Sequence, residues 1–292
     1  MAEQSTSLYV GKILHCNDGY PLAYRHYPSR GSDAAKAVVI IGSALGVSHN
    51  FYRRFAEYLC EHGYECLSFD YRGTGEQSES LSANVSTEHW GILDIEAVIQ
   101  EALASGRPVH FIGHSIGGQL LGLAPSATKL SSITLVAASA PYWKRWQGTA
   151  RFKIWLLSFV LVPVLARLNE PFPIAALGLG NIRIPSRCIA RWAQWMRGED
   201  YLLSAAYGLE RSGYEAIECP LWSIGFSDDE LAPENNIRYL VDFFSNSNST
   251  VDMLKPEAHG LKRLGHNGLF QKQSRDALWP KILSWLDANS KT

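Results

Sequence analysis

Hydrophobic residues along the chain follow two patterns, alternating positions near the N-terminus and short, mostly apolar runs further on. Residues 8–27 alternate apolar and polar side chains around Asn17-Asp18-Gly19, which predicts two strands joined by a tight turn. Short, mostly apolar runs follow at residues 37–42, 65–70, 109–112, 132–138, 221–226 and 250–254. Such runs are too short for helices and are typical of strands buried on both faces of a parallel sheet.

Segments with helical periodicity separate these runs. They lie at residues 51–61, 88–104, from near 115, 234–244 and 276–288, and His62-Gly63 and Ser105-Gly106 provide stop signals after the first two. Strands that alternate with helices in this way predict an α/β fold with a doubly wound, mostly parallel sheet.

The composition changes between residues 142 and 219, which hold five of the nine tryptophans and several proline-containing breaks. We interpret this segment as an inserted helical cap, or lid, and residues 1–141 and 220–292 as the core. Within it, 13 uncharged residues lie between Lys153 and Arg167 and are interrupted by Pro163, whereas a membrane span needs about 20. A buried cap helix is therefore expected; a lid that binds an acyl chain or touches a membrane is the alternative.

Charge and cysteine content narrow the class of protein. The formal net charge is −1, so no overall field attracts nucleic acid. Five cysteines, an odd number without a C-x-x-C pair, indicate free buried thiols rather than disulfides or structural zinc. Residues 1–12 lack a basic start followed by an apolar run, so no secretory signal is expected and the predicted location is cytoplasmic.

Gly113-His114-Ser115-Ile116-Gly117 matches G-x-S-x-G between a predicted strand and a predicted helix. A sharp turn there would lift Ser115 Oγ above the sheet, and the helix N-terminus would stabilise nearby negative charge. Ser115 is therefore the candidate nucleophile of a nucleophile elbow. The alternative is a glycine-rich turn with an inert N-cap serine.

Two further segments carry a resemblance to a known family. Asp70-Tyr71-Arg72-Gly73-Thr74-Gly75 resembles the D-x-R-G-x-G segment of α/β-hydrolases, and residues 51–56 precede it as in their serine-aminopeptidase-like and esterase-like bacterial branch with a cap domain. The resemblance covers nearly the whole chain and implies the α/β-hydrolase fold. We interpret residues 70–75 as a structural turn closed by an arginine and an aspartate.

The family order of nucleophile, acid and histidine implies where the catalytic base lies. Seven of the nine histidines precede Ser115, which leaves His259 and His266. His266 lies in a segment that resembles a G-H-x-G-F-F motif of one bacterial branch, and it is the preferred base. His259, which follows the last predicted strand closely, remains the alternative.

The acid and the oxyanion hole are implied in the same way. The family acid precedes a proline by four residues, which selects Asp229, whereas counting three residues from Gly225 selects Asp228; the unused neighbour would be solvated or would cap the next helix. The backbone amides of Ile116 and Ala44 are the expected oxyanion donors, although Gly-Ser replaces the usual His-Gly pair before Ala44.

These residues together predict a serine hydrolase that cleaves a carboxylic ester or thioester through a Ser-His-Asp catalytic triad and an acyl-enzyme, with no cofactor or metal. Aromatic side chains in the cap would suit an apolar or aromatic acyl substrate: Trp143, Trp146, Trp155, Trp192 and Trp195. The alternatives are an acyltransferase with the same triad and a non-catalytic protein that binds a small ligand. The oligomeric state stays open.

Overall fold

A computed structural model describes residues 8–31, 34–80 and 85–290. Residues 1–7, on which the expectation about a secretory signal partly rests, lie outside these ranges. Eight strands form one sheet in the order β1-β2-β4-β3-β5-β6-β7-β8, with β1–β2 and β2–β4 antiparallel and the other pairs parallel. The strands are β1 Val10–His15, β2 Pro21–Tyr27, β3 Val38–Gly42, β4 Glu65–Phe69, β5 Val109–His114, β6 Ser132–Val136, β7 Leu221–Phe226 and β8 Ser249–Leu254. The predicted mostly parallel sheet and its N-terminal hairpin are confirmed.

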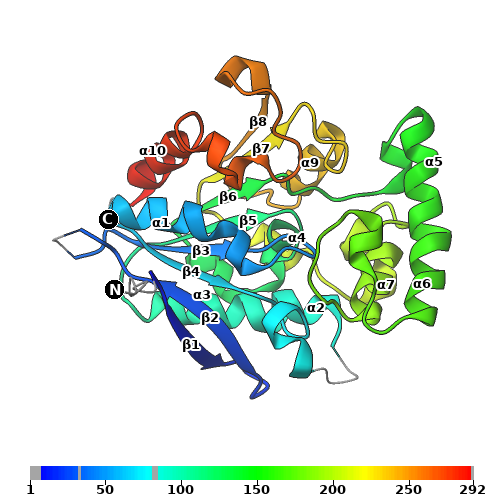
Figure 1. The fold of residues 1–292 in the computed structure, drawn as a ribbon, viewed down its shortest axis with the longest axis horizontal. Helices are drawn as coiled ribbons and strands as arrows, with labels where there is room; N and C mark the ends of the chain where they lie inside the picture. The colour runs from blue at the N-terminus through cyan, green and yellow to red at the C-terminus, as the bar shows by residue number, and fades with distance from the viewer. Residues whose placement is uncertain (1–7, 32–33, 81–84, 291–292) are drawn as a thin grey trace, which may run out of the picture.

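Helices lie on both faces of this sheet (Figure 1). They are α1 Arg53–Glu61, α2 Thr87–His89, α3 Glu96–Leu103, α4 Ile116–Gln119, α5 Gly148–Leu156, α6 Val162–Leu168, α7 Ser186–Trp195, α8 Ser212–Glu215, α9 Glu234–Val241 and α10 Trp279–Asn289. A π-helical turn, Trp90–Ile95, joins α2 to α3.

The strands in the middle of the sheet are buried on both sides, as their mostly apolar runs predict. In β3, Val38 and Ile40 pack into the hydrophobic cluster that includes α3 and the cap, whereas Val39 and Ile41 pack into the cluster that includes α1 and α10. Successive side chains of a strand point to opposite faces, so one five-residue run contributes to both layers.

The segment between β6 and β7, where the cap was placed at 142–219, is helical. Helices α5, α6 and α7 stand together at one end of the molecule, away from the strands (Figure 1). The short α8 packs back on the core, because Tyr214 donates a hydrogen bond from its hydroxyl to the backbone oxygen of Gln119 at 2.5 Å. Helix α8, at the end of this segment, therefore packs with the core layer rather than with the other cap helices.

The structure differs from the sequence prediction at Pro163. Helix α5, a π-helical turn at Leu157–Leu161 and α6 form one continuous helix, Gly148–Leu168, of 21 residues. Proline removes a backbone donor and its ring crowds the preceding turn, and the wider π turn lies where that crowding would occur. The expected interruption is therefore wrong, and so is the expected burial of this helix, because only 11% of an 18-residue window of it is buried. By length and composition this helix is long and apolar enough to cross a membrane.

Candidate active site

Ser115 lies in a strained turn between β5 and α4, with φ 52° and ψ −117°. A non-glycine residue adopts positive φ only where the surrounding structure enforces it, at a cost of roughly 1–3 kcal/mol. The neighbouring glycines make the turn possible: a Cβ on Gly117 would lie 2.5 Å from the backbone oxygen of Gly42, and one on Gly113 would lie 2.6 Å from Cα of Gly118. The strand-turn-helix placement of Ser115 agrees with its prediction as a nucleophile elbow.

His266 and Asp229 come together from two loops at the same edge of the sheet. His266 Nδ1 lies 2.7 Å from Asp229 Oδ2, and Asp229 Oδ1 accepts a hydrogen bond from the Leu231 amide at 2.9 Å. The Asp229 side chain is 1% exposed, so its carboxylate faces the imidazole rather than water. An ionised carboxylate only accepts hydrogen bonds, so Nδ1 carries the proton and Nε2 of the neutral ring is left with its lone pair.

One cavity connects Ser115 and His266. The two side chains line it together with apolar side chains of the cap: Trp146, Ile154, Leu157, Leu179, Trp192 and Met196. Of the five cap tryptophans expected to suit a substrate, only Trp146 and Trp192 line this cavity. No hydrogen bond joins Ser115 Oγ to His266 among the described residues, and such bonds are often loose before a substrate binds.

Asp228 and His259, the two alternatives, lie elsewhere. Asp228 accepts hydrogen bonds from the amides of Leu264 and Gly265 at 2.9 and 3.0 Å, so it holds the backbone that leads to His266. The expectation that the unused aspartate is solvated or caps the next helix is wrong, because two loops distant in sequence pack against each other here. His259 is half-buried in a 3-10 turn, Pro256–His259, and does not line the cavity.

The two expected oxyanion donors differ in their surroundings. The Ile116 amide is at the first position of α4, where the helix itself offers no acceptor. The Ala44 amide instead donates to the Tyr52 hydroxyl at 2.8 Å, so the prediction of Ala44 as an oxyanion donor is wrong. The next amide, that of Leu45, is in a turn closed by a 3.2 Å hydrogen bond from the Val47 amide to the Ala44 oxygen, and Leu45 also lines the cavity.

Tyr52 and His114 connect the three loops of the site, which the sequence alone did not indicate. His114 Nε2 lies 2.9 Å from the backbone oxygen of His266, and its Nδ1 lies 2.8 Å from the Tyr52 hydroxyl. Burial, followed by the proximity of His266, lowers the pKa of His114 to about 3, so the ring is neutral. A carbonyl only accepts, so Nε2 donates to it, Nδ1 accepts from Tyr52, and the Tyr52 oxygen accepts from Ala44.

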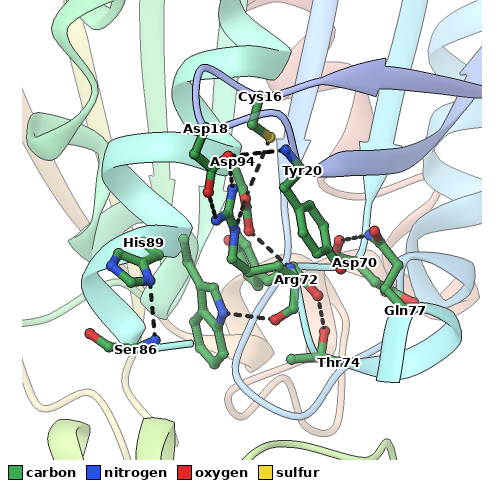
Figure 2. Close-up of polar contacts among 12 residues, drawn as sticks. Cys16, Asp18, Tyr20, Asp70, Arg72, Thr74, Gln77, Ser86, His89 and Asp94 are labelled. Atoms are coloured by element: carbon green, nitrogen blue, oxygen red, sulfur yellow. Dashed lines mark hydrogen bonds and ion pairs between the residues drawn. The ribbon is translucent and has the colours of Figure 1, made fainter. Parts of the chain in front are cut away.

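The Asp70–Gly75 segment lies beside the site and is structural, as interpreted from the sequence. Figure 2 shows the Arg72 guanidinium between the carboxylates of Asp18 and Asp94; Nη1 and Nε lie 2.6 Å from one oxygen of each. Asp70 accepts a hydrogen bond from the His49 amide at 2.7 Å, in the loop that follows β3. These contacts fix the N-terminal hairpin and that loop against the core.

All five cysteines are free thiols, four buried and Cys219 half-buried, in agreement with their prediction. The described residues contain no cluster of three or more histidine, cysteine, aspartate or glutamate side chains that could hold a metal ion.

Comparison with known proteins defines the class. The model of the alpha/beta hydrolase family matches residues 38–278, and the chain belongs to this family. It is similar to a monoglyceride lipase of Saccharomyces cerevisiae, 30% identical over 106 residues, which are 35% of this chain and 34% of that enzyme. The chain thus matches about a third of that relative's length.

Solved structures show the same fold across the whole chain. A soluble variant of the Saccharomyces cerevisiae monoglyceride lipase, in complex with a substrate analog, superposes with a TM-score of 0.70, 16% identity and coverage of 100% of this chain and 99% of that one. An esterase from Exiguobacterium antarcticum gives a TM-score of 0.64 at 18% identity, covering 95% of this chain and 100% of that one.

Proposed function

We propose that this protein is a serine hydrolase that cleaves a carboxylic ester or thioester with an apolar acyl group. One observation carries the proposal: His266, whose Nδ1 is 2.7 Å from the buried Asp229 carboxylate, lines the same cavity as Ser115 in its strained turn. A nucleophile, a base and a group that orients the base are the parts that acyl transfer requires.

In the proposed reaction, His266 Nε2 takes the proton of Ser115 Oγ as Oγ attacks the acyl carbonyl. The Ile116 amide and, in place of Ala44, the Leu45 amide donate to the developing oxyanion; each such donor is worth on the order of 3 kcal/mol. His266 then protonates the leaving alcohol or thiol, and an acyl-enzyme remains on Ser115. Water, deprotonated by His266, attacks this ester, and the acid leaves as Ser115 recovers its proton.

The substrate class is inferred from the cavity. Its roof consists of apolar cap side chains, among them Ile154, Leu157 and Met196, which favour an aliphatic or aromatic acyl group over a charged one. The similarity to a monoglyceride lipase and to an esterase supports an ester in particular.

Two alternatives use the same residues differently. In an acyltransferase an alcohol or amine would replace water, so adding acyl acceptors would divert product from the free acid. A non-catalytic binding protein would have no need of the His266–Asp229 pair, and that pair therefore favours catalysis.

Hydrolysis of p-nitrophenyl esters from acetate to dodecanoate tests the proposal. We expect Ser115→Ala to lower kcat/KM at least about 10³-fold while the near-UV circular dichroism is kept, because only Oγ is lost. Ser284→Ala, at an exposed serine on α10, is the matched control and is expected to turn over normally. Turnover by Ser115→Ala at the wild-type rate would refute the proposed nucleophile.

A further inference from the structure

The continuous cap helix Gly148–Leu168 is strongly apolar although most of it is not buried in the molecule. Its mean hydropathy over an 18-residue window is 1.6, yet only 11% of that window is buried in the molecule. A core helix of this composition would be covered by protein. Figure 1 instead shows α5 and α6 at the outer edge of the molecule, with α7 on their inner side.

The exposed side chains form one apolar surface along this helix. We call it the outer cap face, and it consists of Phe152, Phe159, Val160, Leu161, Val164 and Leu168, which are 37–74% exposed. Trp155 joins its aromatic members: the ring centroids of Phe152 and Trp155, and of Trp155 and Phe159, lie 5.8 Å apart in stacked pairs. A contiguous apolar patch of this kind marks an interaction surface.

Basic residues flank the outer cap face, and Asp242 is the one acidic residue in the surface pocket that Lys144, Arg145 and Arg151 line. Residues 142–168 contain five cations and neither aspartate nor glutamate: Lys144, Arg145, Arg151, Lys153 and Arg167. None of the five forms an ion pair with a carboxylate of the described residues. The chain as a whole has a net charge of −1, so this positive charge is local.

We propose that the outer cap face binds the surface of an anionic lipid bilayer. Apolar and aromatic side chains would enter the boundary between headgroups and acyl chains, and the bordering lysines and arginines would attract lipid phosphates and carboxylates. A second copy of this chain fits less well, because a symmetric contact through the same face would place the two sets of cations opposite one another.

The helix lies in the bilayer surface rather than across it, because its inner side is used by the protein. Ile154 and Leu157 line the cavity of Ser115, and the backbone oxygen of Ser158 accepts hydrogen bonds from Arg197 Nε and Nη2 at 3.0 and 2.6 Å. A spanning orientation would break these contacts. Docking on the outer side places a lipid phase one helix away from the proposed acyl site, and this part of the inference rests on the proposed function.

Sedimentation with vesicles tests the docking. We expect the purified full chain to bind phosphatidylcholine vesicles that contain about 30 mol% phosphatidylserine, to bind pure phosphatidylcholine much less, and to be released by about 0.5 M NaCl. Each cation contributes about fivefold to the partition coefficient, so Arg151→Gln with Lys153→Gln should lower it on the order of 20-fold. Phe152→Ser with Phe159→Ser should lower it at least about tenfold.

Matched controls separate this proposal from the proposed function. Ile13→Ser removes an apolar side chain that is 66% exposed on β1, and it should leave vesicle binding unchanged. Ser115→Ala should bind vesicles like the wild type, so loss of hydrolysis and loss of binding report on different claims. The helix and β1 variants change exposed residues, and near-UV circular dichroism checks that every variant folds.

Four results would overturn the inference. One is absence of binding to anionic vesicles by the folded wild type; a second is binding that the helix variants do not change. The third is retention on vesicles after high salt and alkaline carbonate, which would indicate a spanning helix. A dimer in analytical ultracentrifugation that Phe152→Ser dissociates, without vesicle binding, would assign the outer cap face to a second copy and also contradict the proposal.

Discussion

Replacement of Tyr52 by phenylalanine tests the hydrogen-bonded chain that holds the loops of the candidate site. Tyr52 is fully buried, and its hydroxyl accepts from the Ala44 amide and donates to His114 Nδ1, both at 2.8 Å. Phenylalanine keeps the ring and its edge contact with Phe270, whose centroid lies 4.8 Å away. The substitution therefore removes one oxygen and leaves two buried polar groups without a partner.

The expected loss of stability follows from those two groups. An unpaired buried donor or acceptor costs about 1–3 kcal/mol, so Tyr52→Phe should reduce the free energy of unfolding by about 4 kcal/mol. We also expect ester turnover to fall on the order of tenfold, because the hydroxyl ties the Ala44 loop, through His114, to the backbone oxygen of His266.

Urea denaturation at constant m-value measures the change. Tyr58→Phe is the matched control: Tyr58 lies on α1, and its hydroxyl makes no hydrogen bond to another described residue, so its loss should cost less than about 0.5 kcal/mol. A change below about 1 kcal/mol for Tyr52→Phe would refute the reasoning that its hydroxyl satisfies the two buried groups.

Three further outcomes are expected. Asp229→Asn should lower ester turnover on the order of 10³–10⁴-fold in steady-state assays, whereas Asp228→Asn, which keeps one acceptor oxygen, should lower it only on the order of tenfold; the reverse order would contradict the assignment of the acid. Gly117→Ala should destabilise the fold by about 2–3 kcal/mol in urea, because its Cβ would lie 2.5 Å from a backbone oxygen, and Gly198→Ala, whose nearest neighbour is at 3.5 Å, should not. Burial lowers the pKa of His110 to about 4, so the folded state resists protonation that the unfolded state accepts near its usual pKa of about 6.5. This group therefore stabilises the fold above pH ~6.5, and the stabilisation is lost as the pH falls towards ~4. The free energy of unfolding should fall between pH ~7 and ~5, and His110→Gln should make that fall about 2 kcal/mol smaller. An equal fall in the wild type and the variant would contradict this reasoning.

The sheet could be predicted from sequence because its signals are local. Each central strand is one short run such as Val38–Gly42, and its consecutive apolar residues indicate burial on both faces. The placement of Ser115 is local as well, since a strand, a glycine-flanked serine and a helix follow one another directly.

The errors concern contacts and turns that the pattern of apolar and polar residues does not encode. The apolar and polar pattern does not show that the Ala44 amide donates its hydrogen bond to the Tyr52 hydroxyl. Asp228 accepts hydrogen bonds from amides that lie 36 and 37 residues further along the chain. The helix across Pro163 depends on a π-helical turn that hydrophobic periodicity does not reveal. These features arise from packing, which a one-dimensional pattern does not record.

Covalent labelling with a fluorophosphonate tests the central claim, that Ser115 is a nucleophile activated by His266. The serine oxygen displaces fluoride from phosphorus, so an activated serine acquires one stable phosphonyl group. We predict one adduct per chain, mapped to Ser115 by peptide mass spectrometry, that is absent in Ser115→Ala and forms far more slowly in His266→Ala. A folded wild-type protein that remains unlabelled, or equal labelling of Ser115→Ala, would contradict the account.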